Sequence, residues 1–264
     1  KCSRHNHTDH CDGKHSVDEM VRAAYEAGCS VFGISEHSCT PFDPEGGIAA
    51  EKVDAYLSDT RRAAAEYCGK MTVLCGVEWE LYTPKETLFG TGDEAGNAAG
   101  SEGNAPGADA GSRAGERLRD ARDIYDYVIG SAHYVKKDGR YLSVDMSRDD
   151  LAGSVREFYG GDALAFAEDY YRTVSQVVEV TDCDIIGHFD LITKFNEGGA
   201  FFDTRDERYR RAAAGALDIL VPAGRIFEIN SGALSRGYRT EPYPSPDILK
   251  ELHRRGARII FSSD

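Results

Sequence analysis

The 264-residue chain carries a formal net charge of −14 and a hydrophobic fraction of 41%. That fraction is ample for a globular core, and no segment reaches the roughly 18 apolar residues of a membrane helix. The negative charge repels polyanions, so it argues against a nucleic-acid partner. We therefore expect a cytoplasmic protein with no membrane or nucleic-acid partner. A small anionic substrate fits this charge if local cations or metals bind it.

Short β-rich runs alternate with longer amphipathic segments along the chain. Strands are predicted at 4–8, 30–35, 72–79, 127–132, 184–189, 225–230 and 258–263. Two helix starts are marked, since Ser16 and Glu19 form a capping box and Ser245 precedes Pro246. Repeated strand–helix units imply an α/β fold with a parallel sheet. At this length, a closed or nearly closed barrel is favoured over an open Rossmann sheet.

Residues 90–117 interrupt this alternation. The segment has no aromatic residue and no aliphatic residue larger than alanine, so it cannot bury itself. We expect a disordered low-complexity insert within a single barrel domain that spans residues 1–264. A lid over the active site is the weaker alternative for this insert.

Good metal ligands stand at or just after the ends of six predicted strands. They are His5 and His7, Glu36 with His37, Glu78, His133, His188 and Asp264. In a strand, residues two apart point to the same side, so His5 and His7 could bind one ion together. The carboxyl ends of parallel barrel strands converge on one face. Imidazole and carboxylate ligands therefore predict a site for two or three divalent transition-metal ions, zinc, manganese or iron.

Each ligand alone is weak evidence. A lone histidine at a strand end is more often a satisfied polar residue, and Glu78 or Asp264 could simply cap a helix. Five of the eight histidines at successive strand ends nevertheless favour a metal cluster over chance. His10 and His15 are ambiguous, and His253 is interpreted as solvated surface.

The ordered motifs resemble those of the PHP phosphoesterases. They are His5-Asn6-His7-Thr8, Cys11-Asp12-Gly13-Lys14, Gly33-Ile34-Ser35-Glu36-His37, Gly76-Val77-Glu78, Ile129-Gly130-Ser131-Ala132-His133, Ile186-Gly187-His188-Phe189-Asp190, Glu228-Ile229-Asn230-Ser231-Gly232 and Ser262-Ser263-Asp264. The stretch Glu241-Pro242-Tyr243-Pro244-Ser245, with the second, fifth and seventh of these motifs, resembles the histidinol-phosphate phosphatase branch. The resemblance implies a distorted (β/α)7 barrel, the PHP fold, with a trinuclear metal centre.

The resemblance also assigns the ligands. It implies one ion at His5, His7, Glu78 and Asp264, a second shared by Glu78, His133 and His188, and a third at Asp12 and His37. In the family, a further metal-binding histidine and a last helix follow the seventh strand, whereas this sequence stops at Asp264. We expect that helix to be missing and Ile259, Ile260 and Phe261 to be uncovered.

The resemblance implies a phosphatase acting on a small phosphorylated substrate, most specifically L-histidinol phosphate in histidine biosynthesis. Clustered ions would supply a nucleophile at neutral pH and neutralise the phosphoryl oxygens. We assign Glu78, Asp264 and His188 to catalysis. Arg236 and Lys194 are assigned to the substrate phosphate, with solvated surface charge as the alternative. Asp190, together with Glu80, is a candidate for binding the cationic groups of histidinol.

Three alternatives remain. An amidohydrolase-like barrel also begins with H-x-H and ends in Asp, although Glu78 and the Ser-Asp ending favour a PHP phosphoesterase. A phosphoesterase of nucleotides would be expected to show a stronger basic track. A catalytically impaired metal-binding PHP module is the non-enzymatic alternative.

Overall fold

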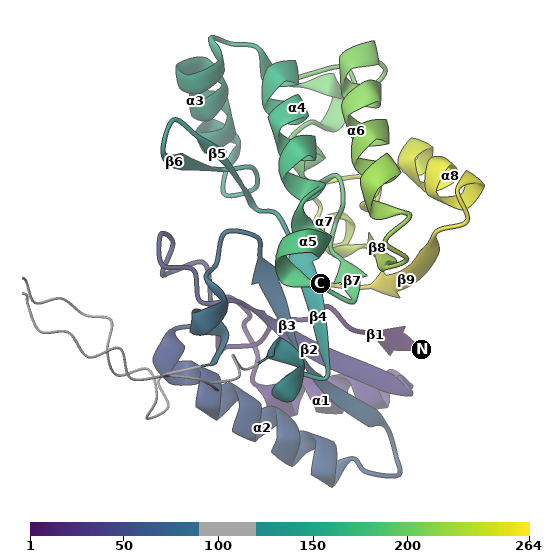
Figure 1. The fold of residues 1–264 in the computed structure, drawn as a ribbon. Coiled ribbons are helices and arrows are strands. Elements are labelled where there is room, and N and C mark those ends of the chain that lie inside the picture. Colours follow the sequence, from purple (N-terminus) through teal and green to yellow (C-terminus); the bar gives the residue numbers. More distant parts are fainter. Residues whose placement is uncertain (90–119) are drawn as a thin grey trace, which may run out of the picture.

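The computed structural model describes residues 1–89 and 120–264. Seven parallel strands form one sheet that is nearly closed into a barrel (Figure 1). In pairing order they are β1 (Cys2–Ser3), β2 (Val31–His37), β3 (Thr72–Glu80), β4 (Tyr127–Ser131), β7 (Ile185–Ile186), β8 (Ile226–Asn230) and β9 (Arg258–Ser262). The two edges meet where the backbone N–H of Asp264 donates to the carbonyl of His5 at 2.8 Å. The predicted distorted seven-stranded barrel is confirmed, while the predicted insert lies outside the described residues.

Helices cover the outer face of the sheet, with α1 and α2 beside β2 and β3 and the others gathered on the opposite side (Figure 1). They are α1 (Val17–Glu26), α2 (Val53–Glu66), α3 (Arg148–Tyr159), α4 (Ala163–Val174), α5 (Val177–Thr181), α6 (Glu207–Leu220), α7 (Gly232–Ser235) and α8 (Pro246–Arg254). Both predicted starts are confirmed, because Ser16 and Glu19 cap α1 reciprocally and Pro246 opens α8. None of the described helices is both long enough and apolar enough to cross a bilayer.

The first strand differs from its prediction. It was expected at 4–8, but the regular pairing ends at Ser3. Asn6 still lies beside β2, since its backbone carbonyl accepts the N–H of Ser35 at 2.9 Å and its Nδ2 donates to the carbonyl of Gly33 at 2.7 Å. His5 and His7 therefore follow the paired strand rather than lying within it, but their imidazoles point to the same cluster, as predicted. The fifth strand is likewise shorter than predicted.

The sequence analysis missed a hairpin between β4 and α3. Strands β5 (Tyr134–Lys137) and β6 (Arg140–Ser143) pair antiparallel around Asp138 and Gly139. Both turn residues have positive φ, 47° and 77°, which is the geometry that favours Asp-Gly in two-residue hairpins. The hairpin leads the chain back toward the carboxyl ends of the barrel strands.

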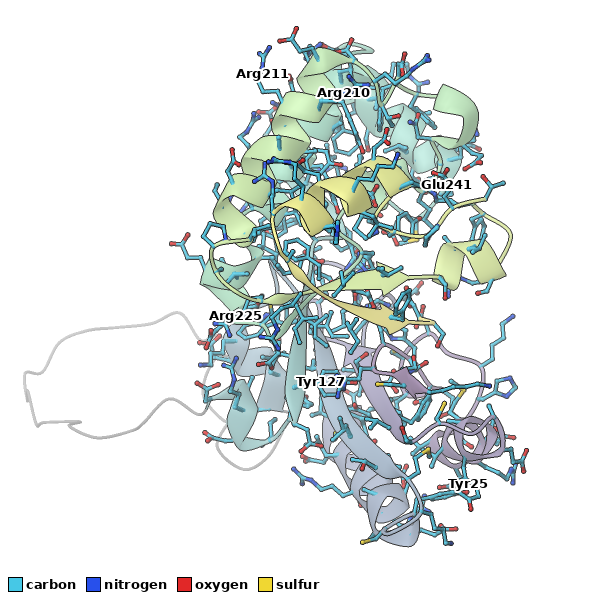
Figure 2. All side chains as sticks on the ribbon, turned by 90° about the vertical axis from the view of Figure 1, so that its right-hand side faces the viewer. Tyr25, Tyr127, Arg210, Arg211, Arg225 and Glu241 are labelled. Atoms are coloured by element: carbon cyan, nitrogen blue, oxygen red, sulfur yellow. The ribbon has the colours of Figure 1, made fainter. Side chains whose placement is uncertain are left out.

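The barrel interior is filled by a small apolar cluster around Tyr127, which lies near the centre of the molecule (Figure 2). Its ring occupies space that two glycines leave free. A Cβ atom would lie 2.4 Å from the nearest atom of the Tyr127 side chain at Gly33 and 2.3 Å at Gly76. The hydroxyl donates to the carbonyl of Ile34 at 3.1 Å. Tyr127 thus ties β4 to β2 across the interior.

The larger apolar cluster lies between the strands and the helices. On β9, however, Ile259 and Phe261 are 48% and 67% exposed, as predicted. Ile260 was also expected to be uncovered, but it packs against the inner cluster instead. Alternate residues of a strand face opposite sides, which accounts for this difference.

Candidate metal centre

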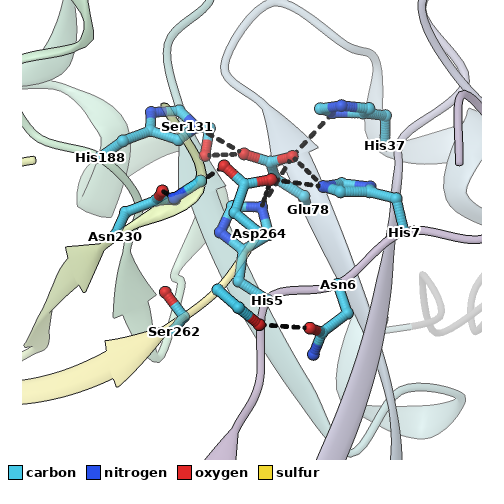
Figure 3. A network of polar contacts seen from close by, with 12 residues as sticks. His5, Asn6, His7, His37, Glu78, Ser131, His188, Asn230, Ser262 and Asp264 are labelled. Carbon is cyan, nitrogen blue, oxygen red and sulfur yellow. Dashed lines mark hydrogen bonds and ion pairs between the residues drawn. The ribbon is translucent and has the colours of Figure 1, made fainter. Parts of the chain in front are cut away.

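Glu78, at the carboxyl end of β3, is a buried carboxylate surrounded by imidazoles (Figure 3). Its Oε2 lies 2.7 Å from His37 Nδ1, 3.2 Å from His5 Nε2 and 3.6 Å from His7 Nε2, and its Oε1 lies 2.9 Å from His188 Nε2 and 3.5 Å from His133 Nε2. Five histidines from four separate parts of the barrel rim therefore meet at one carboxylate. This is the gathering that the sequence predicts.

Asp264 and Asp12 extend this cluster on two sides. Asp264 Oδ1 lies 3.3 Å from His7 Nε2, and Asn230 Nδ2 donates to its Oδ2 at 2.8 Å. Asp12 lies farther out, with oxygens 3.9 Å from His7 Nδ1 and from His37 Nε2. The structure thus brings all eight predicted ligand residues together, with Asp12 at the exposed edge. That they hold ions stays a prediction.

The donor atoms fit divalent ions. His5 Nε2, His7 Nε2 and Glu78 Oε2 are buried, and none of their close contacts with described residues has the geometry of a hydrogen bond. Leaving such atoms unsatisfied is costly. Several sets of three ligand atoms lie within 4.8 Å of one another, among them those of His5, His7 and Asp264. Imidazole nitrogens and carboxylate oxygens are the donors that zinc, manganese and iron accept.

The charges within the cluster are strongly coupled. Burial opposes protonation of His133, but Glu78 and Glu80 outweigh it and raise its pKa to about 10. The pKa of His5 is also raised well above its usual value, because nearby carboxylates outweigh its burial. Burial would raise the pKa of Glu78, yet His5 and the other imidazoles hold it well below its ordinary range. Without ions, Glu78 is therefore charged at neutral pH, and His5 and His133 hold protons.

Two further carboxylates orient the imidazoles, and the sequence analysis did not assign this role to them. Glu228 Oε1 lies 2.7 Å from His5 Nδ1, and its Oε2 accepts the backbone N–H of His188 at 2.9 Å. Glu80, expected beside the substrate, instead lies 2.9 Å from His133 Nδ1. Such partners fix the ring so that Nε2 faces the metal site. The i, i+2 spacing of Glu78 and Glu80 on one strand was the available signal.

The first loop closes one side of the cluster. Glu36, predicted beside His37 among the strand-end ligands, accepts the backbone N–H of Thr8 at 3.1 Å and the thiol of Cys11. Within this loop, the backbone of Gly13 packs against the backbone of His7, and a Cβ atom at Gly13 would lie only 2.7 Å from it. Only glycine fits so close an approach. Glu36 thus holds the loop that carries Asp12.

A cavity of about 640 Å³ opens over the cluster. Besides ligand residues, its lining includes Lys14, Asp145, Leu191, Lys194, Arg236, Tyr238 and Tyr243. Arg236 and Lys194 thus reach the cavity that their predicted role requires. Asp190 does not line it, because the side chain is buried and its Oδ2 accepts the backbone N–H of Ser245 at 2.9 Å. Asp145, which follows the unpredicted hairpin, faces the cavity instead.

The remaining histidines lie apart from Glu78. His10 Nε2 lies 3.2 Å from Asp59 Oδ2 on the outer side of the first loop. His15 is exposed at the cavity rim. His253 is exposed on α8, as predicted.

Fold and site together define the class of barrel proteins that gather possible metal ligands at the carboxyl ends of their strands. The PHP domain family matches residues 3–232, and the chain belongs to this family. This confirms the resemblance found in the sequence motifs.

Two curated relatives carry the same name, "Probable histidinol-phosphatase". The relative from Deinococcus radiodurans is 26% identical over 269 residues, covering 100% of this chain and 85% of the relative. The relative from Schizosaccharomyces pombe is 24% identical over 281 residues, covering 99% of this chain and 79% of the relative.

Two solved structures share the fold. The "putative histidinol phosphatase hisK" of Listeria monocytogenes matches with a TM-score of 0.76 at 20% identity, over 100% of this chain and 94% of the other. The histidinol phosphate phosphatase of Lactococcus lactis, complexed with zinc, L-histidinol and phosphate, matches with a TM-score of 0.64 at 16% identity, over 100% and 85%.

Proposed function

We propose that this PHP-family protein is a metal-dependent phosphatase, a phosphoric monoester hydrolase, that converts L-histidinol phosphate to L-histidinol. The observation that carries the proposal is the set of five imidazoles around buried Glu78 beneath a cavity lined by cations. The names of both curated relatives and the ligands of the Lactococcus lactis structure support this substrate. The family match weighs against an amidohydrolase-like barrel.

The cluster would hold two or three ions through His5, His7, Asp12, His37, Glu78, His133, His188 and Asp264. When bound, such ions neutralise phosphoryl oxygens and make a nucleophile available at neutral pH. Glu78 and His188 are in contact at 2.9 Å. We assign them the role of holding the nucleophile and the substrate phosphate together at the base of the cavity. Glu228 and Glu80 hold the imidazole rings in place, so the site is preorganised.

Asp264 is the proposed proton acceptor. Burial would raise its pKa, but His5 and His7 outweigh burial and keep it well below the usual value. The carboxylate is therefore ionised at neutral pH, and it would pass a proton from the attacking water to the departing alkoxide, which leaves as the alcohol.

Arg236 and Lys194 are proposed to bind the phosphate. Both line the cavity, and Arg236 Nη1 donates to the backbone carbonyl of Asp264 at 2.8 Å, which holds the guanidinium beside the ligand cluster. Cations in this position would hold the dianionic phosphoryl group over the ions.

Phosphate release from the manganese- or zinc-loaded protein tests this function. We expect kcat/KM for L-histidinol phosphate to exceed that for nucleoside monophosphates and p-nitrophenyl phosphate by at least about 100-fold, because a polar site rejects substrates that leave its groups unpaired. Equal rates on all three would support only a general phosphatase. No release from any of them, at full metal occupancy, would favour the catalytically impaired module.

A further inference from the structure

The unpredicted hairpin brings one acidic residue to the cavity. Chain segment 144–147 links β6 to α3, and Asp145 within it lines the cavity over the metal cluster. Two other acidic residues, Asp12 and Asp264, line the cavity, and both belong to groups of possible metal ligands. Among the described residues, Asp145 belongs to no such group. The mechanism proposed above leaves Asp145 without a role.

The partners of Asp145 leave its carboxylate available. Lys194 Nζ donates to the backbone carbonyl of Asp145 at 2.8 Å, but it lies 3.4 Å from the side-chain Oδ2. Ser143 Oγ is also distant, at 3.4 Å from Oδ1. Both contacts are long for charge-assisted or hydroxyl hydrogen bonds. The side chain is 25% exposed, so a ligand in the cavity can reach it.

Asp145 is also charged at neutral pH. Burial would raise its pKa, but His133 and Lys194 outweigh burial and lower it. Lys194 Nζ, 3.4 Å from Oδ2, bonds the backbone carbonyl more closely than the carboxylate, so the ion pair is incomplete. An ammonium group from the substrate would complete it.

The cavity also offers positively charged side chains. Lys14, Lys194 and Arg236 line it, and these cations suit a phosphate dianion. A substrate that carries a phosphate and an amine could place both charges in this one cavity, the phosphate at the cations and the amine at Asp145. A phosphate ester without the amine would leave Asp145 unpaired, which costs binding.

We propose that Asp145 is a specificity-determining residue that binds the cationic amine of the substrate and thereby selects amino-alcohol phosphates over other phosphate monoesters. The inference rests on the proposed function and deepens it. Tyr238 and Tyr243 line the same cavity. Their aromatic rings could pack against the imidazole of the substrate.

The test compares Asp145→Asn with the wild-type manganese-loaded protein on two substrates. For L-histidinol phosphate we expect kcat/KM to fall by about 10- to 100-fold, the effect of losing a hydrogen bond to a charged group. For p-nitrophenyl phosphate, which has no amine, we expect a change of less than about 2-fold. Asp149→Asn, which removes the same charge from the exposed first turn of α3, should alter neither rate.

Binding of the product gives a readout that needs no turnover. The dissociation constant of L-histidinol, measured by calorimetry on metal-loaded protein, should rise by a similar factor in Asp145→Asn and stay unchanged in Asp149→Asn. An equal loss on both phosphate substrates would mean that Asp145 acts through Lys194 or through the fold, and it would overturn the proposal. Unchanged selectivity would overturn it as well.

A second comparison does not depend on the folding of any variant. Acetylation of the amine of L-histidinol phosphate removes its charge, so wild-type protein should use the acetylated ester at least about 10-fold less well. Equal kcat/KM for both esters would contradict the proposed role of Asp145 but would not contradict the phosphatase activity. A wild-type protein that neither releases phosphate nor binds L-histidinol would instead remove the proposed function itself.

Discussion

Arg236 is anchored at the cavity rim through one nitrogen, because its Nη1 donates to the carbonyl of Asp264 at 2.8 Å. Its side chain is 49% exposed, and its Nη2 lies 3.9 Å from Asp264 Oδ2, so the guanidinium keeps N–H groups free for phosphoryl oxygens. We expect Arg236→Ala to lower kcat/KM for phosphate monoesters by about 10- to 100-fold without changing metal content. Arg211→Ala, on the exposed face of α6, is the control. Steady-state kinetics that match wild type would exclude Arg236 from the phosphate site.

Individual residues differed in how far the sequence could predict them. The gathering of most ligand residues could be predicted, because they lie at or near the ends of parallel strands, and such strands end at one rim. Glu228 could not be assigned, since its contact with His5 joins β8 to the segment after β1 and leaves no local pattern. Asp145 was missed for the same reason, and Asp190 was favoured only by its nearness to His188 in sequence.

At the scale of elements, the packing of the Tyr127 ring inside the barrel requires residues without a side chain at positions 33 and 76, and both are glycine. Gly76→Ala would place a Cβ 2.3 Å from the ring of Tyr127, which is itself held between strands. We expect a loss of about 1–3 kcal/mol in the free energy of unfolding, as for other overpacked cores. Gly153→Ala is the matched substitution, because a Cβ there meets nothing within 4 Å and the residue lies inside α3. It should stabilise the protein by about 0.5–1 kcal/mol.

Urea unfolding of both glycine variants measures this difference. If Gly76→Ala were as stable as Gly153→Ala, Tyr127 would not be confined as described.

The strand pattern predicted the barrel but not the hairpin. Barrel strands β2, β3 and β4 are almost wholly buried, so they form continuous apolar runs. Strands β5 and β6 are half exposed and only four residues long, which leaves too little periodicity to recognise. The Asp138-Gly139 pair was the signal that could have indicated them.

At the scale of the whole molecule, ions and protons compete for one cluster. The pKa of His133 is raised from 6.5 to about 10 in the ion-free protein. Its protonation therefore stabilises that protein fully below pH 6.5, and the contribution is lost as pH rises through 10. Ions bind the unprotonated imidazole, so we expect metal affinity to increase over the same range and metal binding to release protons.

Calorimetric titration of the ion-free protein with zinc, in two buffers of different ionisation enthalpy, counts those protons. We expect release of at least one proton per chain at pH 7 and saturation at two or three ions, which elemental analysis should match. Heats that do not depend on the buffer would contradict the raised histidine pKa values. Saturation below one ion would contradict the ligand cluster.

The seam between β1 and β9 has a consequence for how the protein folds. His5 and Asp264 come from opposite edges of the sheet and meet through a backbone hydrogen bond of 2.8 Å. Contacts of such high sequence separation form late, since the intervening chain must be ordered first. With the seam open, Glu78 would still contact His133 and His188, but His5 and Asp264 would be apart, so we expect high affinity for the complete group of ions only after the barrel has closed.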